Sequence, residues 1–428
     1  MSDATRSNET SRREFLKASA AVAAGTALAS AIATKAYAAP GDVLRVGLIG
    51  CGGRGSGAAP QALMADKNAK LVAMADAFSN RLESALDGLK KSKVGSQVAV
   101  DADHKFVGFD AYKKLIDSGV DVVVLATSPH FRPMHLKACI DAGKHVFCEK
   151  PVAVDGPGVR SVLATTEEAK KKNLCIVSGL CWRYHKPKSE TIARCQDGAI
   201  GDIHTMQCTY NTGGLWVAPK KPEWSEMEWQ MRNWLYFTWL SGDFIVEQHI
   251  HSLDKAPWVM KDEYPVKVTA NGGRQVRTGK EYGHIYDHFN TVYEFKNGAK
   301  CFASCRQMPN CDGDVTDYFW GTKGMCDVFG HRITGEKAWQ YNGPQNDMYQ
   351  TEHDELFAAI RAGKTINNGE YMAKSTLMAI MGRMAAYTGK TITWEQALNS
   401  KEDLSPPKYE WCDIPVPPVA MPGITKFV

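Results

Sequence analysis

Short apolar runs alternate with amphipathic stretches in the first half of the chain, between residues 44 and 178. The runs have the length and apolar character of buried parallel strands, and the stretches between them have helical periodicity. The expected strands cover residues 44–49, 70–75, 122–126, 144–148 and 174–178, and the expected helices cover residues 58–64, 134–142 and 158–171. This alternation predicts an α/β fold in which residues 41–180 form a doubly wound parallel sheet.

The periodicity changes after residue 200. Strand patterns now follow one another without long crossovers, and Asn297-Gly298 is typical of a hairpin turn. The expected strands cover residues 203–210, 266–271, 291–295, 300–305 and 318–328, and two amphipathic helices cover residues 352–361 and 372–387. We therefore expect residues 181–428 to form an α+β domain with a mainly antiparallel sheet, ending in a Pro-rich arm.

The N-terminus has the pattern of a secretory signal. Arg12 and Arg13 precede an Ala-rich run over residues 18–33, and Ala-Tyr-Ala follows at residues 36–38. The paired arginines predict that residues 1–38 are a twin-arginine signal peptide, which exports folded proteins to the periplasm. The run has too few bulky apolar residues for a stable membrane span. The alternative is an ordinary Ala-rich helix.

Composition narrows the class of protein. The chain has 428 residues, of which 44% are hydrophobic and 23% are charged, values ordinary for a soluble enzyme. The net charge of +4 is too balanced for a nucleic-acid-binding surface. Twelve cysteines are too few for a disulfide scaffold. Several of them lie in apolar runs, so we expect buried thiols.

A glycine-rich motif, Gly-Cys-Gly-Gly-Arg-Gly, follows the first expected strand at residues 50–55. In a Rossmann domain the first glycine permits a tight turn, the second lets a pyrophosphate approach the backbone, and the third lets helix and strand pack closely. The helix that follows offers free N–H groups to the phosphates. The expected dinucleotide contacts are Gly50, Gly52, Gly53, Arg54 and Gly55. An α/β domain without a nucleotide is the alternative.

Asp76 ends the second expected strand, 21 residues after Gly55. A carboxylate at this place binds both hydroxyls of the adenosine ribose. Because it would also repel a 2′-phosphate, NAD is favoured over NADP. Arg81 would soften this preference and is a further candidate contact.

Two other strand ends carry candidate site residues. Thr127 and His130 follow one expected strand, and Glu149 and Lys150 follow the next. Ligands of open α/β sheets lie at the carboxyl ends of the strands, so we expect these four residues beside the cofactor. Pro151 permits a cis bond that would direct Lys150 into the crevice. A surface ion pair between Lys150 and Glu149 is the alternative.

The glycine motif, Asp76 and Glu149-Lys150-Pro151 together resemble the Gfo/Idh/MocA family, which includes glucose–fructose oxidoreductases and inositol dehydrogenases. The resemblance extends from about residue 42 to about residue 330. The motif's lysine is catalytic in this family, which implies that Lys150 is catalytic. The resemblance also implies that the antiparallel sheet is open, forms a wall of the substrate site and often serves as an oligomer interface.

Family members carry an aspartate and a histidine four residues apart on a helix that faces the nicotinamide. The corresponding residues here are Glu247 and His251, which would share one helix face. The resemblance implies that His251 is the general base, that Glu247 orients and polarises it, and that Lys150 relays protons or polarises the substrate oxygen. Glutamate here replaces the usual aspartate, and His249 replaces a small residue.

A metal site is the alternative for this segment. If residues 247–251 formed a strand, Glu247, His249 and His251 would share one face, with His288 as a possible fourth ligand. We expect a helix and no metal.

Other residues are candidates for substrate binding. The resemblance implies substrate contacts for Arg183, Tyr184 and His185, next to Trp182, and His249 lies beside the expected base. Tryptophan is abundant just before Glu247, and aromatic faces bury the apolar faces of pyranose rings. The cluster comprises Trp216, Trp224, Trp229, Trp234 and Trp239. Trp234 is our candidate for sugar contact, although core packing would also explain the cluster.

These inferences converge on an exported NAD(P)-dependent oxidoreductase that acts on a sugar or polyol. Free dinucleotide is scarce outside the cytoplasm, so we expect the cofactor to be tightly bound and regenerated within the site. One alternative is an NAD-dependent glycoside hydrolase that uses transient oxidation, elimination, hydration and reduction. Another is a cofactor-loaded carbohydrate-binding protein without catalysis. The expected partners are the export machinery and further copies of this chain, with no nucleic acid and no membrane for the mature form.

Overall fold

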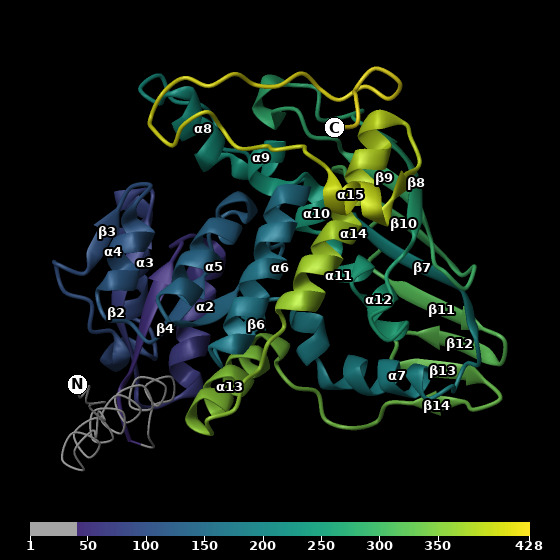
Figure 1. Cartoon of the computed structure of the whole chain (residues 1–428), viewed down its shortest axis with the longest axis horizontal. Coiled ribbons are helices and arrows are strands. Elements are labelled where there is room, and N and C mark those ends of the chain that lie inside the picture. The colour runs from purple at the N-terminus through teal and green to yellow at the C-terminus, as the bar shows by residue number, and fades with distance from the viewer. Residues whose placement is uncertain (1–40) are drawn as a thin grey trace, which may run out of the picture.

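The computed structural model describes residues 41–428, which form two β-sheets joined by helices (Figure 1). The predicted signal peptide lies outside the described residues. The predicted fold class is confirmed, because a parallel sheet precedes a mainly antiparallel one along the chain. Within residues 41–428, no helix is both long enough and apolar enough to cross a bilayer.

The first sheet, sheet A, has six parallel strands in the order β3-β2-β1-β4-β5-β6. Its strands are β1 (Leu44–Ile49), β2 (Ala69–Asp76), β3 (Lys105–Val107), β4 (Val122–Leu125), β5 (His145–Cys148) and β6 (Ile176–Ser178). The strand order reverses between β1 and β4. At such a reversal the connecting loops diverge to opposite faces and leave a crevice at the carboxyl ends of the strands.

Helices cover both faces of sheet A, as its fully buried strands β4, β5 and β6 require. The helices within this half of the chain are α2 (Gly53–Ala65), α3 (Ser79–Lys90), α4 (Ala111–Asp117), α5 (Arg132–Asp141) and α6 (Gly156–Lys171). One face also receives a helix from far along the chain, because α13 (Met348–Arg361) packs against α2 and buries Leu356 and Phe357 there. The C-terminal region therefore completes the half of the structure that contains sheet A.

The second sheet, sheet B, has nine strands in the order β14-β13-β12-β11-β7-β10-β9-β8-β15. Its strands are β7 (Ile203–Thr212), β8 (Lys267–Gly273), β9 (His288–Glu294), β10 (Lys300–Gln307), β11 (Asp317–Gly321), β12 (Gly324–Asp327), β13 (Arg332–Gly335), β14 (Trp339–Gln340) and β15 (Ile392–Thr393). All neighbours pair antiparallel except β7 and β10, which are parallel because the long connection after β7 returns the chain in the same direction.

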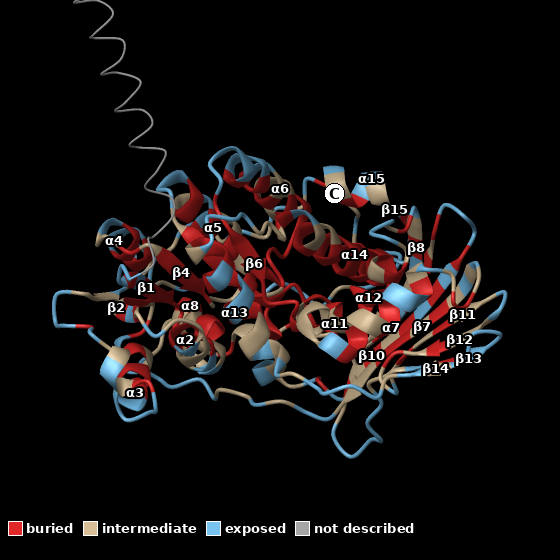
Figure 2. Ribbon diagram, turned by 90° about the horizontal axis from the view of Figure 1, so that it is seen from below, coloured by how far each residue is buried: buried red, intermediate tan, exposed pale blue. Residues whose placement is uncertain are grey.

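Helix α14 (Gly369–Thr388) joins the two halves. It packs against α6 on one side and β8 on the other, and every residue from Ser375 to Thr388 is buried (Figure 2). The remaining helices are α7 (Lys186–Gln196), α8 (Glu226–Arg232), α9 (Thr238–Ser241), α10 (Phe244–Glu247), α11 (Ile250–Leu253), α12 (Lys255–Val259) and α15 (Trp394–Asn399). Burial on all sides over this stretch suits a helix that lies between two sheets.

A third cluster of buried residues lies above sheet A. It joins residues 215–241, which we call the cap, to the loops after β2 and β4. The C-terminal arm, residues 401–428, runs over α8 and α9 of the cap (Figure 1) and adds Ile414 to the same cluster. The cap and arm thus cover the side of sheet A on which its strands end.

Candidate functional site

A cavity of about 340 Å³ lies at the carboxyl ends of the parallel strands, where the order of sheet A reverses. Most residues that the sequence singled out line this cavity. They are Gly50, Gly52, Gly53, Arg54, Asp76, Arg81, Thr127, Glu149, Lys150, Trp234, Glu247 and His251. The other candidates do not line it, and these are Gly55, His130, Arg183, Tyr184, His185 and His249.

The glycine motif forms the floor of the cavity. Gly50 has a positive φ of 95°, and a Cβ there would lie 2.6 Å from the backbone of Ala126. A Cβ on Gly55 would lie 1.8 Å from the carbonyl oxygen of Gly50, so only glycine lets α2 approach this closely. At Gly52 and Gly53 a Cβ would meet no atom within 4 Å. This open space beside the N-terminus of α2 fits the diphosphate of a dinucleotide.

Asp76 fixes the same loop from the end of β2. Its carboxylate accepts hydrogen bonds from the backbone N–H of Cys51 at 2.7 Å and of Phe78 at 2.9 Å. Burial raises the pKa of Asp76, while these two N–H groups and the cations of Arg81 and Arg232 act in the opposite direction. The carboxylate lies on the cavity wall, at the place where a ribose diol would bind.

Arg54 links the glycine motif to two distant carboxylates. Its guanidinium forms ion pairs with Glu149 and, at 2.8 Å, with Glu352 of α13. It also lies 5.1 Å from the ring centroid of Tyr349, which lines the cavity. Sequence reasoning missed Tyr349 and Glu352, since nothing local to α13 indicates that it returns to a loop almost 300 residues earlier. Glu149 is thus paired with Arg54, and Lys150 is free to point elsewhere.

Lys150 points to Glu247. Its ammonium group donates to the Glu247 carboxylate at 2.9 Å and to the backbone carbonyl of the same residue at 2.5 Å. The Lys150 and Glu247 side chains are only 12% and 15% exposed, and both line the cavity. The Lys150–Pro151 peptide bond is cis. The structure therefore brings together a lysine and a glutamate that lie 97 positions apart.

The segment around Glu247 is helical but irregular. Helix α10 ends at Glu247, and α11 begins at Ile250. Between them the backbone N–H of His249 reaches the carbonyl of Phe244 at 3.2 Å, five residues earlier, which is the hydrogen bond of a π-bulge. We expected Glu247 and His251 on one regular helix, but they lie on two short helices, α10 and α11. Both residues nevertheless line the cavity.

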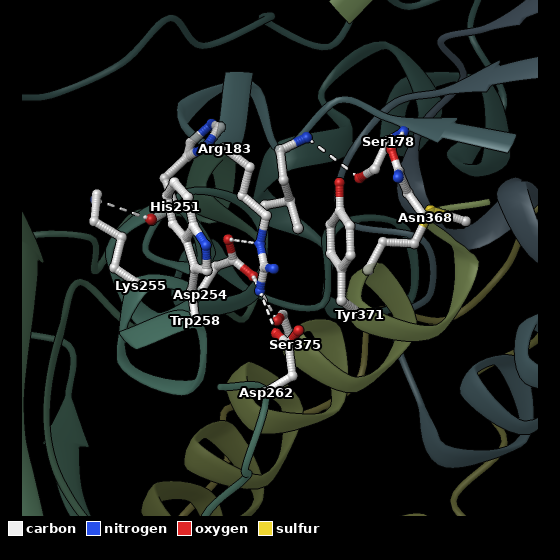
Figure 3. A network of polar contacts seen from close by, with 12 residues as sticks. Ser178, Arg183, His251, Asp254, Lys255, Trp258, Asp262, Asn368, Tyr371 and Ser375 are labelled. Atoms are coloured by element: carbon white, nitrogen blue, oxygen red, sulfur yellow. Dashed lines mark hydrogen bonds and ion pairs between the residues drawn. The ribbon is translucent and has the colours of Figure 1, made fainter. Parts of the chain in front are cut away.

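His251 is held neutral. Burial lowers its pKa well below the usual range, and the cations of Lys150, Lys255 and Arg54 lower it further. Its ring lies 5.2 Å from that of Trp182, and Lys255 donates to its backbone carbonyl at 3.1 Å (Figure 3). A neutral imidazole on a cavity wall can accept a proton from a bound hydroxyl.

A fully buried ion pair lies next to His251 and Trp182. Lys255 lies 2.6 Å from the Asp317 carboxylate, and its ammonium group lies 3.3 Å from the ring centroid of Trp182. The sequence did not single out Lys255 or Asp317, because the two residues are on different elements, α12 and β11.

Arg183 is engaged by protein groups instead of the cavity. It binds Asp254 through two hydrogen bonds of 2.9 and 3.0 Å, pairs with Asp262 at 3.0 Å and lies 4.0 Å from the ring centroid of Tyr371 (Figure 3). The neighbouring Tyr184 donates its hydroxyl hydrogen to Asn368 at 2.6 Å. These contacts join the chain after β6 to α12 and α14.

Three candidate histidines also lie away from the cavity. The ring of His185 lies 5.3 Å from that of His331. His130 hydrogen-bonds through Nε2 to the hydroxyl of Tyr409 at 2.8 Å, and burial lowers its pKa to about 4. His249 is fully buried, and burial lowers its pKa to about 3. All three contact protein groups outside the cavity.

The strand on which the metal alternative depends is absent from residues 244–253, which are mostly helical. His249 is buried apart from Glu247 and His251, and His288 pairs with Asp287 at 2.8 Å. Across residues 41–428, no three His, Cys, Asp or Glu side chains are grouped so that they could hold a metal ion.

The tryptophan cluster divides into two kinds of environment. Trp234 lines the cavity, and Trp216, 48% exposed, lies 6.3 Å from it between ring centroids. Trp229 and Trp239 are buried and donate their indole N–H groups within the cap. Packing therefore accounts for the latter two, and Trp234 is the tryptophan placed to meet a ligand.

Family comparisons agree with this geometry. Residues 44–179 match the model described as "Oxidoreductase family, NAD-binding Rossmann fold", and residues 191–327 match the "GFO/IDH/MocA C-terminal domain". Residues 9–29 match the twin-arginine translocation signal sequence, which shows export by this pathway. The second match begins within α7 and ends with β12.

Two inositol dehydrogenases are similar in sequence. Myo-inositol 2-dehydrogenase of Thermotoga maritima is 28% identical over 258 residues, which is 60% of this chain and 66% of the relative. Inositol 2-dehydrogenase of Rhizobium meliloti is 24% identical over 319 residues, or 74% of this chain and 86% of the relative.

Solved structures share the fold. The aldose-aldose oxidoreductase from Caulobacter crescentus, complexed with glycerol, superposes with a TM-score of 0.63 at 21% identity, covering 82% of this chain and 99% of its own. A levoglucosan dehydrogenase in complex with NADH and levoglucosan gives a TM-score of 0.62 at 20% identity with the same coverage. At these identities the likeness establishes the architecture of both halves.

Proposed function

Because the chain belongs to the Gfo/Idh/MocA family of NAD-binding oxidoreductases, we propose that it transfers hydride between a tightly bound NAD and a hydroxyl of a sugar or polyol. One observation carries this proposal. Lys150, Glu247 and His251 converge on the cavity that the glycine motif and Asp76 also line.

The chain's own residues supply the acid–base part of this reaction. The neutral His251 accepts the proton of the substrate hydroxyl, and the Lys150 ammonium group polarises the oxygen that becomes a carbonyl. Glu247 holds Lys150 in place through its two hydrogen-bonded oxygens. The chemistry that a bound nicotinamide would supply is acceptance of the hydride from the oxidised carbon.

The cofactor assignment depends on Asp76. Its carboxylate ends β2 on the cavity wall and would repel a 2′-phosphate, which favours NAD over NADP. Gly50, Gly52, Gly53 and Arg54 would surround the diphosphate at the start of α2.

The substrate class is supported by the relatives and by the cavity. The two most informative sequence relatives are inositol dehydrogenases, whose substrate is a ring polyol. Trp234 lines the same cavity as Lys150 and His251, so its ring would be available to the apolar face of such a substrate. The twin-arginine signal supports export of the folded chain, and a periplasmic location is part of the proposal. Retention of the cofactor between turnovers would be an advantage there.

Assembly of several copies through sheet B is part of the proposal. The outward side chains of β7 to β11 form a shallow open surface, on which Phe302 is 48% exposed beside Val292 and Trp320. An exposed apolar patch on an open sheet face suits an interface between subunits. Sedimentation of the wild type and of Phe302→Lys tests it, and a monomeric wild type would contradict it.

The central experiment identifies the nucleotide and then the substrate. Purified exported protein is denatured and the released nucleotide is analysed by mass spectrometry; we expect NAD. The intact protein is then incubated with polyols, sugars and glycosides, with and without added NAD. NADH formation with a polyol or sugar supports the proposal, whereas aglycone release without net NADH would favour the NAD-dependent glycosidase.

Variants make the assay specific. Lys150→Met should abolish turnover, while Lys137→Met, at an exposed surface ion pair, should leave it unchanged. If the wild type releases no nucleotide and binds no added NADH, the proposed function is wrong.

A further inference from the structure

The C-terminal arm reaches the part of the cavity where the adenosine of the proposed NAD would lie. In a Rossmann domain, the residue that ends β2 binds the adenosine ribose, so the adenine lies just beyond it. Phe78 follows Asp76 after β2, and Phe109 follows β3; both line the cavity. These two side chains therefore mark the adenosine end.

Trp411 of the arm contacts both phenylalanines from outside. Its ring stacks on Phe78 with the centroids 5.3 Å apart and the planes at 28°. It lies 4.6 Å from the ring of Phe109, tilted by 45°. One exposed side chain thus bridges the loops after two neighbouring strands.

A second contact ties the arm to the loop after β4. The hydroxyl of Tyr409 lies 2.8 Å from Nε2 of His130, and its ring lies 6.1 Å from that of Phe109. Both side chains are partly buried, so this hydrogen bond is partly shielded from solvent. The arm therefore contacts the loops that follow β2, β3 and β4.

The arm is itself fastened at both ends of this span. The backbone N–H of Leu404 donates to Asp155 at the start of α6, at 3.0 Å. At the other end the N–H of Met227 in α8 donates to the carbonyl of Cys412 at 3.1 Å. The segment between these anchors cannot move away from the loops unless these hydrogen bonds break.

We propose that the arm, through Trp411 and Tyr409, forms the outer layer of an adenosine subsite and slows dissociation of the bound dinucleotide. The inference rests on the proposed NAD site and extends it to residues outside both family-matched regions. Phe78 and Phe109 must shift for adenosine to leave, and Trp411 holds both in place. A protein exported with its cofactor would retain it by this contact.

The test measures release of NADH. Nucleotide-stripped protein is loaded with NADH and mixed with excess ADP-ribose, and the loss of bound-NADH fluorescence gives the dissociation rate. The stabilisation from one aromatic pair corresponds to about a several-fold change in the dissociation rate. Trp411 makes two such pairs, so we expect Trp411→Ala to release NADH about tenfold faster or more. Trp411→Phe keeps a stacking ring, so its rate of NADH release should lie between those of the wild type and Trp411→Ala.

Two controls isolate the mechanism. Val416→Ala changes a residue of the same arm with the same exposed fraction as Trp411, 43%, and should release NADH at the wild-type rate. The affinity for ADP-ribose should fall with that for NADH in Trp411→Ala, whereas the affinity for nicotinamide mononucleotide should not change. Equal losses for both fragments would overturn the assignment to the adenosine end.

Further outcomes are equally decisive. If Trp411→Ala and Tyr409→Phe, both folded, release NADH as slowly as the wild type, the arm has no role in retention, although the proposed function stands. If Trp411→Ala does not fold, Tyr409→Phe must still accelerate release, and a rate equal to that of the wild type overturns the proposal. If the wild type binds no NADH, the proposed function itself is wrong and this inference falls with it.

Discussion

The ammonium group of Lys150 binds both the carboxylate and the backbone carbonyl of Glu247, at 2.9 and 2.5 Å. The lysine therefore depends on this one residue for its position on the cavity wall. Meanwhile Glu149, its neighbour in sequence, is paired with Arg54. The two carboxylates beside Lys150 thus have separate tasks, one facing the glycine motif and one facing the lysine.

This division predicts different effects for two glutamine substitutions. Glu247→Gln weakens the attachment of Lys150 and should lower kcat about tenfold or more, with little change in NADH affinity. Glu149→Gln removes one of the two carboxylate partners of Arg54 and should weaken NADH binding instead. Steady-state kinetics and NADH fluorescence titration measure the two effects. Equal effects of both variants on both quantities would contradict the division.

His251 should behave as a general base. His251→Gln should lower kcat about 100- to 10,000-fold while NADH affinity is retained. The pKa of His251 lies well below its usual range, and the neutral form is the active one. Activity should therefore show no loss as pH falls from 8 to 6.5, and should fall only when pH approaches the depressed pKa. A pH profile of kcat/KM measures this, and an inflection near the ordinary histidine pKa would argue against a buried neutral base.

Asp76 should determine the choice of dinucleotide. Asp76→Ser removes a negative charge from the ribose site while Arg81 and Arg232 remain beside it. We expect the ratio of NADPH affinity to NADH affinity to rise about tenfold or more, which corresponds to roughly 1.4 kcal/mol. Fluorescence titration with both nucleotides is the measurement, with Asp117→Ser as an exposed control. An unchanged ratio of the two affinities would show that Asp76 does not contact the adenosine ribose.

Arg183 should support stability instead of substrate binding. Its side chain is only 9% exposed, and it binds Asp254, which is almost fully buried. Because Arg183→Met leaves that carboxylate without its cation, it should reduce the free energy of unfolding by about 3–5 kcal/mol. Arg332→Met removes an exposed cation that lies 3.8 Å from the Asp327 carboxylate, and it should cost less than about 1 kcal/mol. If Arg183→Met instead raised KM and left the stability unchanged, Arg183 would be a substrate-binding residue.

Buried His249 should make the fold sensitive to acid. It stays neutral in the folded protein, with a pKa of about 3, but is protonated in the unfolded chain below its ordinary pKa. The unfolded state therefore binds more protons as pH falls, and stability decreases from pH 7 to pH 5. One such histidine accounts for about 2 kcal/mol of this loss.

His249→Phe tests this directly through denaturant unfolding at the two pH values. The loss of stability between pH 7 and pH 5 should shrink by about 2 kcal/mol in this variant. His204→Phe, at an exposed position of β7, should retain the full loss. A variant with the wild-type pH dependence would show that His249 is accessible to protons in the folded state.

The elements of both sheets could be read largely from the sequence. The run at residues 122–125 has no polar position, and the run at residues 44–49 has only Arg45, a pattern typical of strands buried on both faces. The glycine motif, Asp76 and Glu149-Lys150-Pro151 were also visible, because each is a short segment whose backbone geometry or position at a strand end is itself the requirement. Burial and turn geometry are local properties, so a local pattern carries them.

Only the tertiary structure decided which groups these residues meet. Arg183 stands beside the last parallel strand, as a substrate ligand would, yet Asp254 and Tyr371 enclose it. Glu352 reaches Arg54 from almost 300 residues away, and Trp411 reaches Phe78 from the far end of the chain. Such contacts depend on where whole elements pack. The periodicity and spacing of residues do not specify this packing, because any apolar or charged surface of matching shape could form the same contacts.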